Sequence, residues 1–140
     1  MATAGCSPEI PLLAIVDDDT SIRISTQRLI RSLGFRAEVF ASAQEFLKSG
    51  CAQCTACLIL DLRLPGMDGL QLQRLLASRS HQIPIIFVSA SGSDQDEREA
   101  LEAGAIGFLR KPVSEQSLIN AIPKNHCCTR RSETWTRNSI

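Results

Sequence analysis

Short apolar runs recur along the chain, and each is bounded by polar or turn-forming residues. The four runs are 12–16 (LLAIV), 57–60 (CLIL), 85–88 (IIFV) and 107–109 (GFL). Runs of this length that are apolar at every position are typical of strands buried on both faces of a parallel sheet. Residues 36–40 indicate a further strand, so five strands are expected.

The segments between these runs predict helices. A first helix is expected from an N-cap at Asp19 or Thr20 to Leu33, with Gly34 following as a left-handed cap. The inward faces carry Ile22, Leu29, Ile30 and Leu33 on this helix, and Leu72, Leu75 and Leu76 on a helix after residue 69. The other helices are expected at 43–49, 93–102 and 114–122. This alternation predicts an α/β domain with a parallel sheet, right-handed crossovers and helices on both faces.

Polar residues stand where four of the five strands end. Asp17 and Asp18 follow the first strand, Asp61 the third, Ser89 the fourth and Lys111 the fifth. Ligands of open α/β sheets collect outside the carboxyl ends of the strands. We therefore expect three carboxylates, a hydroxyl and an ammonium group to form one site at this edge of the sheet.

The residue types at this edge favour magnesium and phosphate chemistry. Three converging carboxylates do not all stay ionised without a cation, and oxygen ligands suit Mg²⁺. A carboxylate can act as the nucleophile that accepts a phosphoryl group. The plainer alternative is that the run 17–19 caps a helix and Asp61 begins a turn, but this does not explain Ser89 and Lys111 at the same edge.

Length and charge narrow the class of protein. The chain has 140 residues, enough for one domain, and its formal net charge is zero. Residues 1–122 carry 11 basic and 14 acidic side chains, so no basic surface for direct binding of nucleic acid is expected.

No apolar stretch reaches the roughly 20 residues that cross a membrane, and a cytoplasmic location is expected. Residues 1–11 are interpreted as a flexible leader and 123–140 as a polar, basic, disordered tail.

Six cysteines raise the question of disulfides or a metal centre. Cys51, Cys54 and Cys57 have C-x-x-C-x-x-C spacing, which occurs in metal and iron–sulfur sites. Cys57 falls inside an expected strand, where its side chain should pack in the core, and cytoplasmic thiols stay reduced. The favoured interpretation is one buried cysteine and two loop thiols.

Four motifs, in order and spacing, resemble those of the receiver domain of two-component response regulators. They are I-V-D-D at 15–18, L-I-L-D-L-R-L-P-G-M-D-G at 58–69, V-S-A at 88–90 and R-K-P at 110–112. The resemblance extends over about 12–122 and is greatest to the receiver half of helix-turn-helix regulators. It implies a flavodoxin-like, doubly wound fold with five parallel strands in the order 2-1-3-4-5.

The resemblance also implies a role for each acidic site residue. Asp61 matches the residue that accepts the phosphoryl group. Asp17 and Asp18 match the acidic pair that holds Mg²⁺, with Asp18 the more direct ligand. The backbone carbonyl of Arg63 matches a further ligand of the same ion, to which Asp61 also contributes.

Three further residues match the groups that respond to phosphorylation. Ser89 and Lys111 match the hydroxyl and the ammonium that bind the phosphoryl oxygens, and the peptide bond from Lys111 to Pro112 is expected to be cis. Phe108 matches the aromatic residue whose rotamer reports the switch. The output surface implied by this likeness comprises the helix 93–102, the strand 107–109 and the helix 114–122.

The resemblance implies a signalling phosphoacceptor, whose only reactions are its own phosphorylation and dephosphorylation. The expected donor is a histidine kinase or a histidine phosphotransfer protein, the output protein is unknown, and a phosphorylation-dependent homodimer is expected. The leading interpretation is a stand-alone receiver, and the alternative is the receiver part of a DNA-binding regulator. An enzyme alternative is a haloacid-dehalogenase-type phosphohydrolase, whose nucleophile ends the first strand in a D-x-D-x-T/V pattern. Residues 17–21 match this pattern only in part, because Ser21 stands where threonine or valine belongs, and the alternative leaves Asp61 unexplained. A flavodoxin-like flavin protein is less favoured, because acids follow the first strand.

Overall fold

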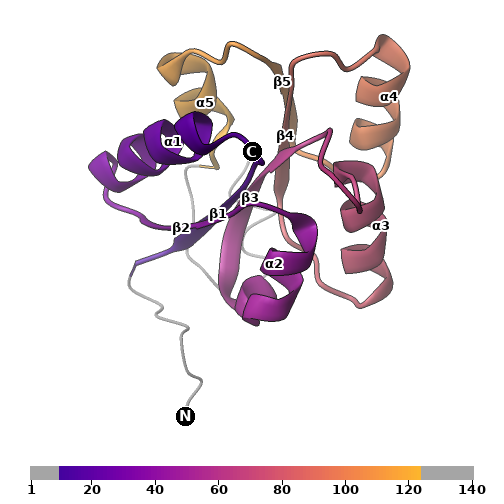
Figure 1. Ribbon diagram of the computed structural model, residues 1–140, viewed down its shortest axis with the longest axis horizontal. Coiled ribbons are helices and arrows are strands. Elements are labelled where there is room, and N and C mark those ends of the chain that lie inside the picture. Colours follow the sequence, from indigo (N-terminus) through magenta and orange to yellow (C-terminus); the bar gives the residue numbers. More distant parts are fainter. Residues whose placement is uncertain (1–9, 124–140) are drawn as a thin grey trace.

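The computed structural model describes residues 10–123, and the expected leader and tail lie almost entirely outside them. Five parallel strands form one sheet in the order β2-β1-β3-β4-β5 (Figure 1). Their bounds are β1 Leu12–Val16, β2 Arg36–Phe40, β3 Thr55–Asp61, β4 Ile85–Ser89 and β5 Gly107–Arg110. The fold class and the strand order expected from the sequence are confirmed.

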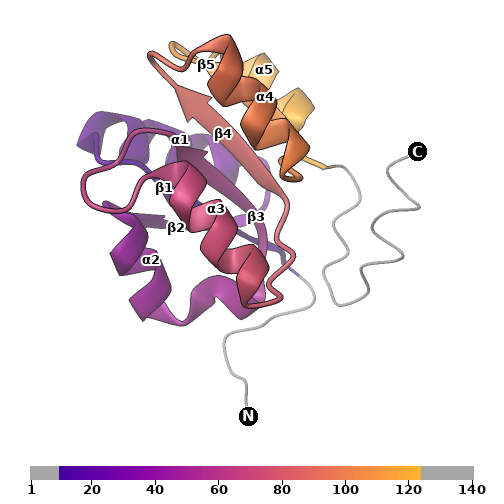
Figure 2. The ribbon, with the colours of Figure 1, turned by 90° about the vertical axis from the view of Figure 1, so that its right-hand side faces the viewer.

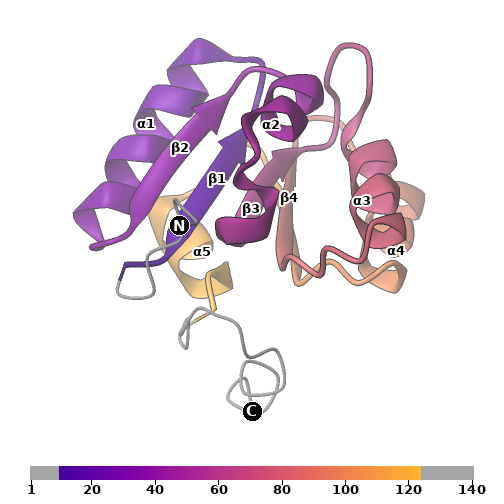
Figure 3. The ribbon, with the colours of Figure 1, turned by 90° about the horizontal axis from the view of Figure 1, so that it is seen from below.

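Helices cover both faces of this sheet. Their bounds are α1 Thr20–Ser32, α2 Ala43–Ser49, α3 Gly69–Ser78, α4 Asp94–Glu102 and α5 Glu115–Ala121, with a short 3-10 helix η1 at Cys51–Cys54. Helices α1 and α5 lie on one face and α2, α3 and α4 on the other (Figures 1 and 3). None of the helices between residues 10 and 123 is both long and apolar enough to cross a membrane.

Alternation along the buried strands separates two cores, because successive side chains of a strand point to opposite faces. Val16 and Leu60 belong to the core beneath α2, α3 and α4, whereas Ile15 and Ile59 belong to the core beneath α1 and α5. The helices contribute their own apolar residues: Phe46, Leu72, Leu76 and Ala100 to the first core, and Ile30 and Leu118 to the second. The site edge is therefore supported from both sides of the sheet.

The first helix differs from the expectation at its end. Asp19, rather than Thr20, is the N-cap, since its carboxylate accepts the Ser21 and Ile22 amides at 2.8 and 3.3 Å. Leu33 was expected on the inward face, but it is the C-cap of α1 and is 39% exposed. Helix α1 ends at Ser32. Leu33 therefore does not follow the helical periodicity that would turn its side chain inward.

The three clustered cysteines occupy different environments. Cys57 is 1% exposed, and burial raises the pKa of its thiol to about 12, so it packs as the expected small apolar residue. Cys51 is a free thiol, but Cys54 is disulfide-bonded, which corrects its interpretation as a loop thiol. Within residues 10–123 the cysteines do not form a metal-ligating group.

The start of α3 lies directly against the end of β3. A Cβ atom at Gly69 would lie 2.7 Å from the Asp61 carbonyl oxygen and 3.1 Å from the Leu62 Cα atom. Because both are backbone atoms of packed structure, we expect Gly69→Ala to lower the free energy of unfolding by about 1–3 kcal/mol. Urea unfolding measures this, with Gly107→Ala as the control, since a Cβ atom there makes only ordinary contacts from 3.7 Å. Equal loss in both variants would contradict the close packing.

Candidate phosphoacceptor and metal site

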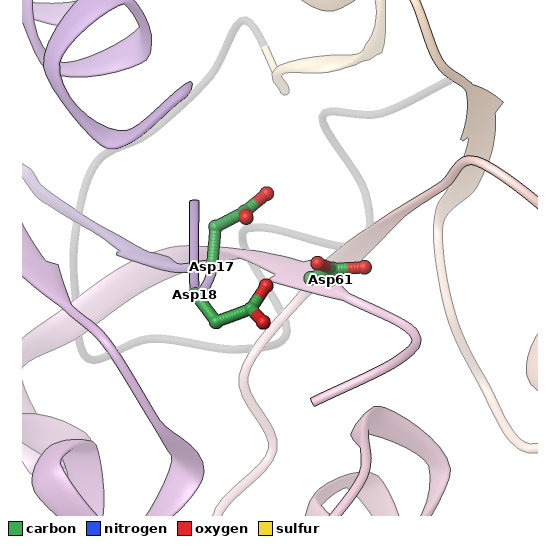
Figure 4. Close-up of side chains that lie close together, drawn as sticks. All are labelled: Asp17, Asp18 and Asp61. Carbon is green, nitrogen blue, oxygen red and sulfur yellow. The ribbon is translucent and has the colours of Figure 1, made fainter. Parts of the chain in front are cut away.

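The strand ends bring the predicted polar residues together at one edge of the sheet. Asp17 and Asp18 directly follow β1, Asp61 ends β3, Ser89 ends β4 and Lys111 directly follows β5. Ligand atoms of the three aspartates all lie within 4.8 Å of one another, and Figure 4 shows their carboxylates side by side on the ends of β1 and β3. The in-register pairing of Val16 with Leu60 and of Asp61 with Val88 sets this alignment.

The Lys111 ammonium bridges two of the carboxylates. Its Nζ atom lies 3.0 Å from Asp17 Oδ2 and 3.3 Å from Asp61 Oδ2. Burial opposes the charged form of Lys111, but the hydrogen bonds and charges of both aspartates outweigh it and raise the pKa of the lysine. Its backbone amide donates to the Ser89 carbonyl at 2.8 Å, and the peptide bond to Pro112 is cis as expected.

The Asp61 carboxylate is poorly accommodated as an anion. Burial and the nearby Asp17 charge raise its pKa to about 6, although Lys111 and the Arg63 amide act in the opposite direction. The side chain is only 7% exposed. An additional cation, or conversion of the carboxylate to another species, would therefore relieve an unfavourable charge at this position.

Backbone amides fix the orientation of the two buried carboxylates. The Asp19 amide donates to Asp17 Oδ1 at 2.9 Å, and the Arg63 amide donates to Asp61 Oδ1 at 3.2 Å. No hydrogen bond or ion pair within residues 10–123 involves the exposed Asp18 carboxylate. Asp17 and Asp61 are thus oriented by hydrogen bonds, and Asp18 has its carboxylate oxygens available. Together the three carboxylates provide the oxygen ligands that Mg²⁺ prefers.

Ser89 and Phe108 meet around Gly92. Ser89 is fully buried, and its hydroxyl accepts the Ser91 amide at 3.2 Å. A Cβ atom at Gly92 would lie 2.9 Å from both Ser89 Oγ and Phe108 Cζ. Phe108 is half-buried in the core beneath α4, with its ring centroid 6.2 Å from that of Phe87. The hydroxyl and the ring are thus separated by the space that this glycine leaves.

Ion pairs that were not predicted from the sequence connect α4 to the site. Arg63, whose backbone carbonyl was expected to contribute to the metal site, also forms an ion pair with Asp96 at 2.9 Å. Arg110 pairs with Glu97 at 2.9 Å, donates to the Gly92 carbonyl and lies over the Phe108 ring. The acidic first turn of the helix expected at 93–102 could have indicated these ion pairs, since acidic side chains at a helix N-terminus are potential partners for nearby arginines.

This fold and edge define a doubly wound α/β domain with an acidic site at the carboxyl ends of its strands. The family model of the response regulator receiver domain matches residues 13–123. The chain therefore belongs to the response regulator receiver family, a family of signalling domains, and the phosphohydrolase alternative is not favoured.

Similar proteins support the same assignment. Response regulator protein TmoT of Ectopseudomonas mendocina is 44% identical over 111 residues, which cover 79% of this chain and 50% of TmoT. Transcriptional regulatory protein TdiR of Thauera aromatica is 39% identical over 77% of this chain and 48% of its own length. The chain thus spans about half the length of these curated relatives.

Solved structures agree with the fold in detail. Response regulator StyR matches with a TM-score of 0.80 and 40% identity, covering 92% of this chain and 66% of the StyR chain. The structure titled FixJ-N matches with a TM-score of 0.71 and 33% identity, covering 79% of this chain and 89% of that one.

Proposed function

We propose that residues 12–122 form a receiver that accepts a phosphoryl group on Asp61. The observation that carries this proposal is the position of the Asp61 carboxylate, which ends β3, is almost fully buried and lies between Lys111 and two further aspartates. The Arg63 amide, which donates to Asp61 Oδ1 at 3.2 Å, orients this carboxylate for attack on phosphorus. Lys111 supplies positive charge where phosphoryl oxygens would lie.

The proposed transfer is an in-line displacement at phosphorus. An Asp61 carboxylate oxygen forms a bond to phosphorus as the bond from phosphorus to the nitrogen of a phosphohistidine breaks, and the imidazole leaves with its electron pair and takes up a proton. The proposed donor is a histidine kinase or a histidine phosphotransfer protein in the cytoplasm. In dephosphorylation, water attacks phosphorus as the bond from phosphorus to the Asp61 oxygen breaks. The products are the Asp61 carboxylate, inorganic phosphate and a proton.

Asp17, Asp18, Asp61 and the carbonyl of Arg63 would hold Mg²⁺. The spacing of the three carboxylates and the uncommitted Asp18 side chain fit such an ion. When bound, Mg²⁺ supplies charge neutralisation for the incoming phosphoryl group. Asp18, being exposed, would offer the ion its most accessible ligand.

Ser89 and Phe108 would transmit the modification to the surface formed by α4, β5 and α5. A phosphoryl group on Asp61 adds acceptor oxygens beside the Ser89 hydroxyl, to which, among residues 10–123, only the Ser91 amide donates. Movement of Ser89 toward these oxygens would open space on the Phe108 side of Gly92. This surface is the proposed contact for an output protein or for a second copy of the chain.

Two arrangements of the whole protein are compatible with this function: a stand-alone receiver, or the receiver part of a DNA-binding regulator. The relative TdiR is named a transcriptional regulatory protein. The phosphohydrolase alternative needs Asp19, the second aspartate of its D-x-D pattern, in the site. Asp19 instead caps α1 through the Ser21 and Ile22 amides, so its carboxylate is committed to the helix. This favours Asp61, on β3, as the nucleophile.

Intact mass spectrometry after incubation with acetyl phosphate and Mg²⁺ tests the proposal. We expect wild type to gain one phosphoryl group, and Asp61→Asn or wild type with a chelator to gain none. Equal gain in Asp61→Asn would contradict the assignment of the acceptor. Steady turnover of phosphate esters would instead support the phosphohydrolase alternative.

A further inference from the structure

The first turn of α4 is fastened to two strand ends by arginines. Arg63, in the loop after β3, lies 2.9 Å from Asp96, while Arg110 on β5 lies 2.9 Å from Glu97 and donates to the Gly92 carbonyl. Figure 2 shows α4 running beside β4, with β5 at its far side. The start of α4 is therefore connected to the site through two separate side chains.

Arg63 contacts both the site and the helix. Its backbone amide donates to Asp61 Oδ1 at 3.2 Å, and its guanidinium donates to Asp96 Oδ2 at 2.9 Å. The Arg63 side chain is 56% exposed, so it is free to take another rotamer. Because its long side chain starts beside the Asp61 carboxylate, a group attached to that carboxylate lies within its range.

Asp96 can lose this arginine without uncapping the helix. Its carboxylate also accepts the Ser93 amide at 3.0 Å, while the Ser93 hydroxyl accepts the Asp96 amide at 3.1 Å. This reciprocal capping box satisfies the helix terminus by itself. Ion pairs between partly exposed side chains contribute little to stability, so the partner of Arg63 can change at small cost.

We propose that Arg63 is a positioning residue whose guanidinium exchanges Asp96 for the phosphoryl group on Asp61, which releases the first turn of α4 from the loop after β3. This inference rests on the proposed phosphoacceptor function. A phosphoryl group carries close to two negative charges and three acceptor oxygens, and guanidinium groups bind phosphate oxygens in pairs. Asp96 offers one charge that Ser93 already satisfies in part. Arg110 retains its contacts, so α4 pivots about its β5 side.

A double-mutant cycle on Arg63 and Asp96 tests the exchange, with acetyl phosphate and Mg²⁺ as probe and the phosphorylation rate read by intact mass. Asp96→Asn keeps an oxygen for the Ser93 amide and frees Arg63, so phosphorylation should be about two- to fivefold faster. Arg63→Gln, which keeps the backbone carbonyl, should be slower by a similar factor. In the double variant the Asp96 substitution should have no further effect. Glu102→Gln removes the same charge from the last turn of α4 and should leave the rate unchanged.

Amide hydrogen exchange over 93–97 gives a second readout. We expect faster exchange in phosphorylated than in unphosphorylated wild type, and exchange that is already fast in unphosphorylated Asp96→Asn. Additive effects of the two substitutions on rate, or unchanged exchange in phosphorylated wild type, would overturn the exchange while Asp61 still gains its phosphoryl group. Absence of any mass gain in wild type would overturn the proposed function itself.

Discussion

Replacing Lys111 by methionine is expected to slow phosphorylation of Asp61 by acetyl phosphate about 100-fold. The lysine ammonium lies 3.0 Å from Asp17 Oδ2 and 3.3 Å from Asp61 Oδ2, and its side chain is only 17% exposed. Removing one preorganised group that stabilises developing charge costs about 10²–10³ in rate. Methionine keeps the length of the side chain but leaves the carboxylates without a compensating charge.

The time course of phosphorylation, followed by intact mass at fixed Mg²⁺ concentration, measures this effect. Lys48→Met is the matched control, because Lys48 is exposed in the last turn of α2, outside the group of site residues. Its rate should stay within about twofold of wild type, since surface charges away from the site act weakly at moderate salt. A Lys111→Met rate as high as that of the control would falsify the role of Lys111 in binding the phosphoryl group.

Asp61→Asn is expected to raise the free energy of unfolding at pH 7.5, in the presence of a chelator, by about 2 kcal/mol. The pKa of Asp61 is about 6 in the folded protein, against 3.8 for the unperturbed group, because of burial and the Asp17 charge. The folded state therefore holds the proton more tightly than the unfolded state. Asparagine avoids the cost of the buried charge, although it also loses the ion pair with Lys111.

The pH dependence has a definite sign. Below about pH 3.8 the carboxyl is protonated in both states, and the difference between wild type and Asp61→Asn should be smallest. As the pH rises through about 6, wild type loses stability relative to the variant, and above that the difference stays constant.

Urea unfolding at several pH values measures the difference between the two proteins, in which the titration of other groups largely cancels. Asp18→Asn is the control, since it removes a charge from an exposed carboxylate of the same cluster. Added Mg²⁺ should then stabilise wild type more than Asp61→Asn. A difference that grows as the pH falls would contradict the raised pKa.

The strands and the site edge could be predicted from sequence because one physical condition produces both signals. A strand buried on both faces must be apolar throughout, so the runs ending at Val16, Leu60 and Val88 stand out, and the polar residue that follows each run marks its exit from the core. Parallel pairing then brings those exits to the same edge. The juxtaposition of Asp17 with Asp61 needed no information beyond this pattern.

Contacts between distant surface side chains could not be predicted in this way. The partners Arg63 and Asp96 are 33 positions apart, and either could pair with several neighbours until the approach of α4 to the β3–α3 loop is known. Gln73, a polar residue of α3, is 5% exposed and donates to the Ala100 carbonyl of α4 at 3.1 Å. Local periodicity contains no signal for a polar group whose partner belongs to another helix.

The three consecutive aspartates at 17–19 have different environments and different structural roles. Asp17 is buried against Lys111, Asp18 is exposed and uncommitted within residues 10–123, and Asp19 caps α1. Substitution at these positions should therefore follow three different rules: Asp17 is restricted by volume and charge, Asp18 by its oxygen donors, and Asp19 only by the need for a short acceptor. Serine or asparagine would be tolerated at the third position and not at the first, so a family profile that treats the run as one acidic motif would merge three separate constraints.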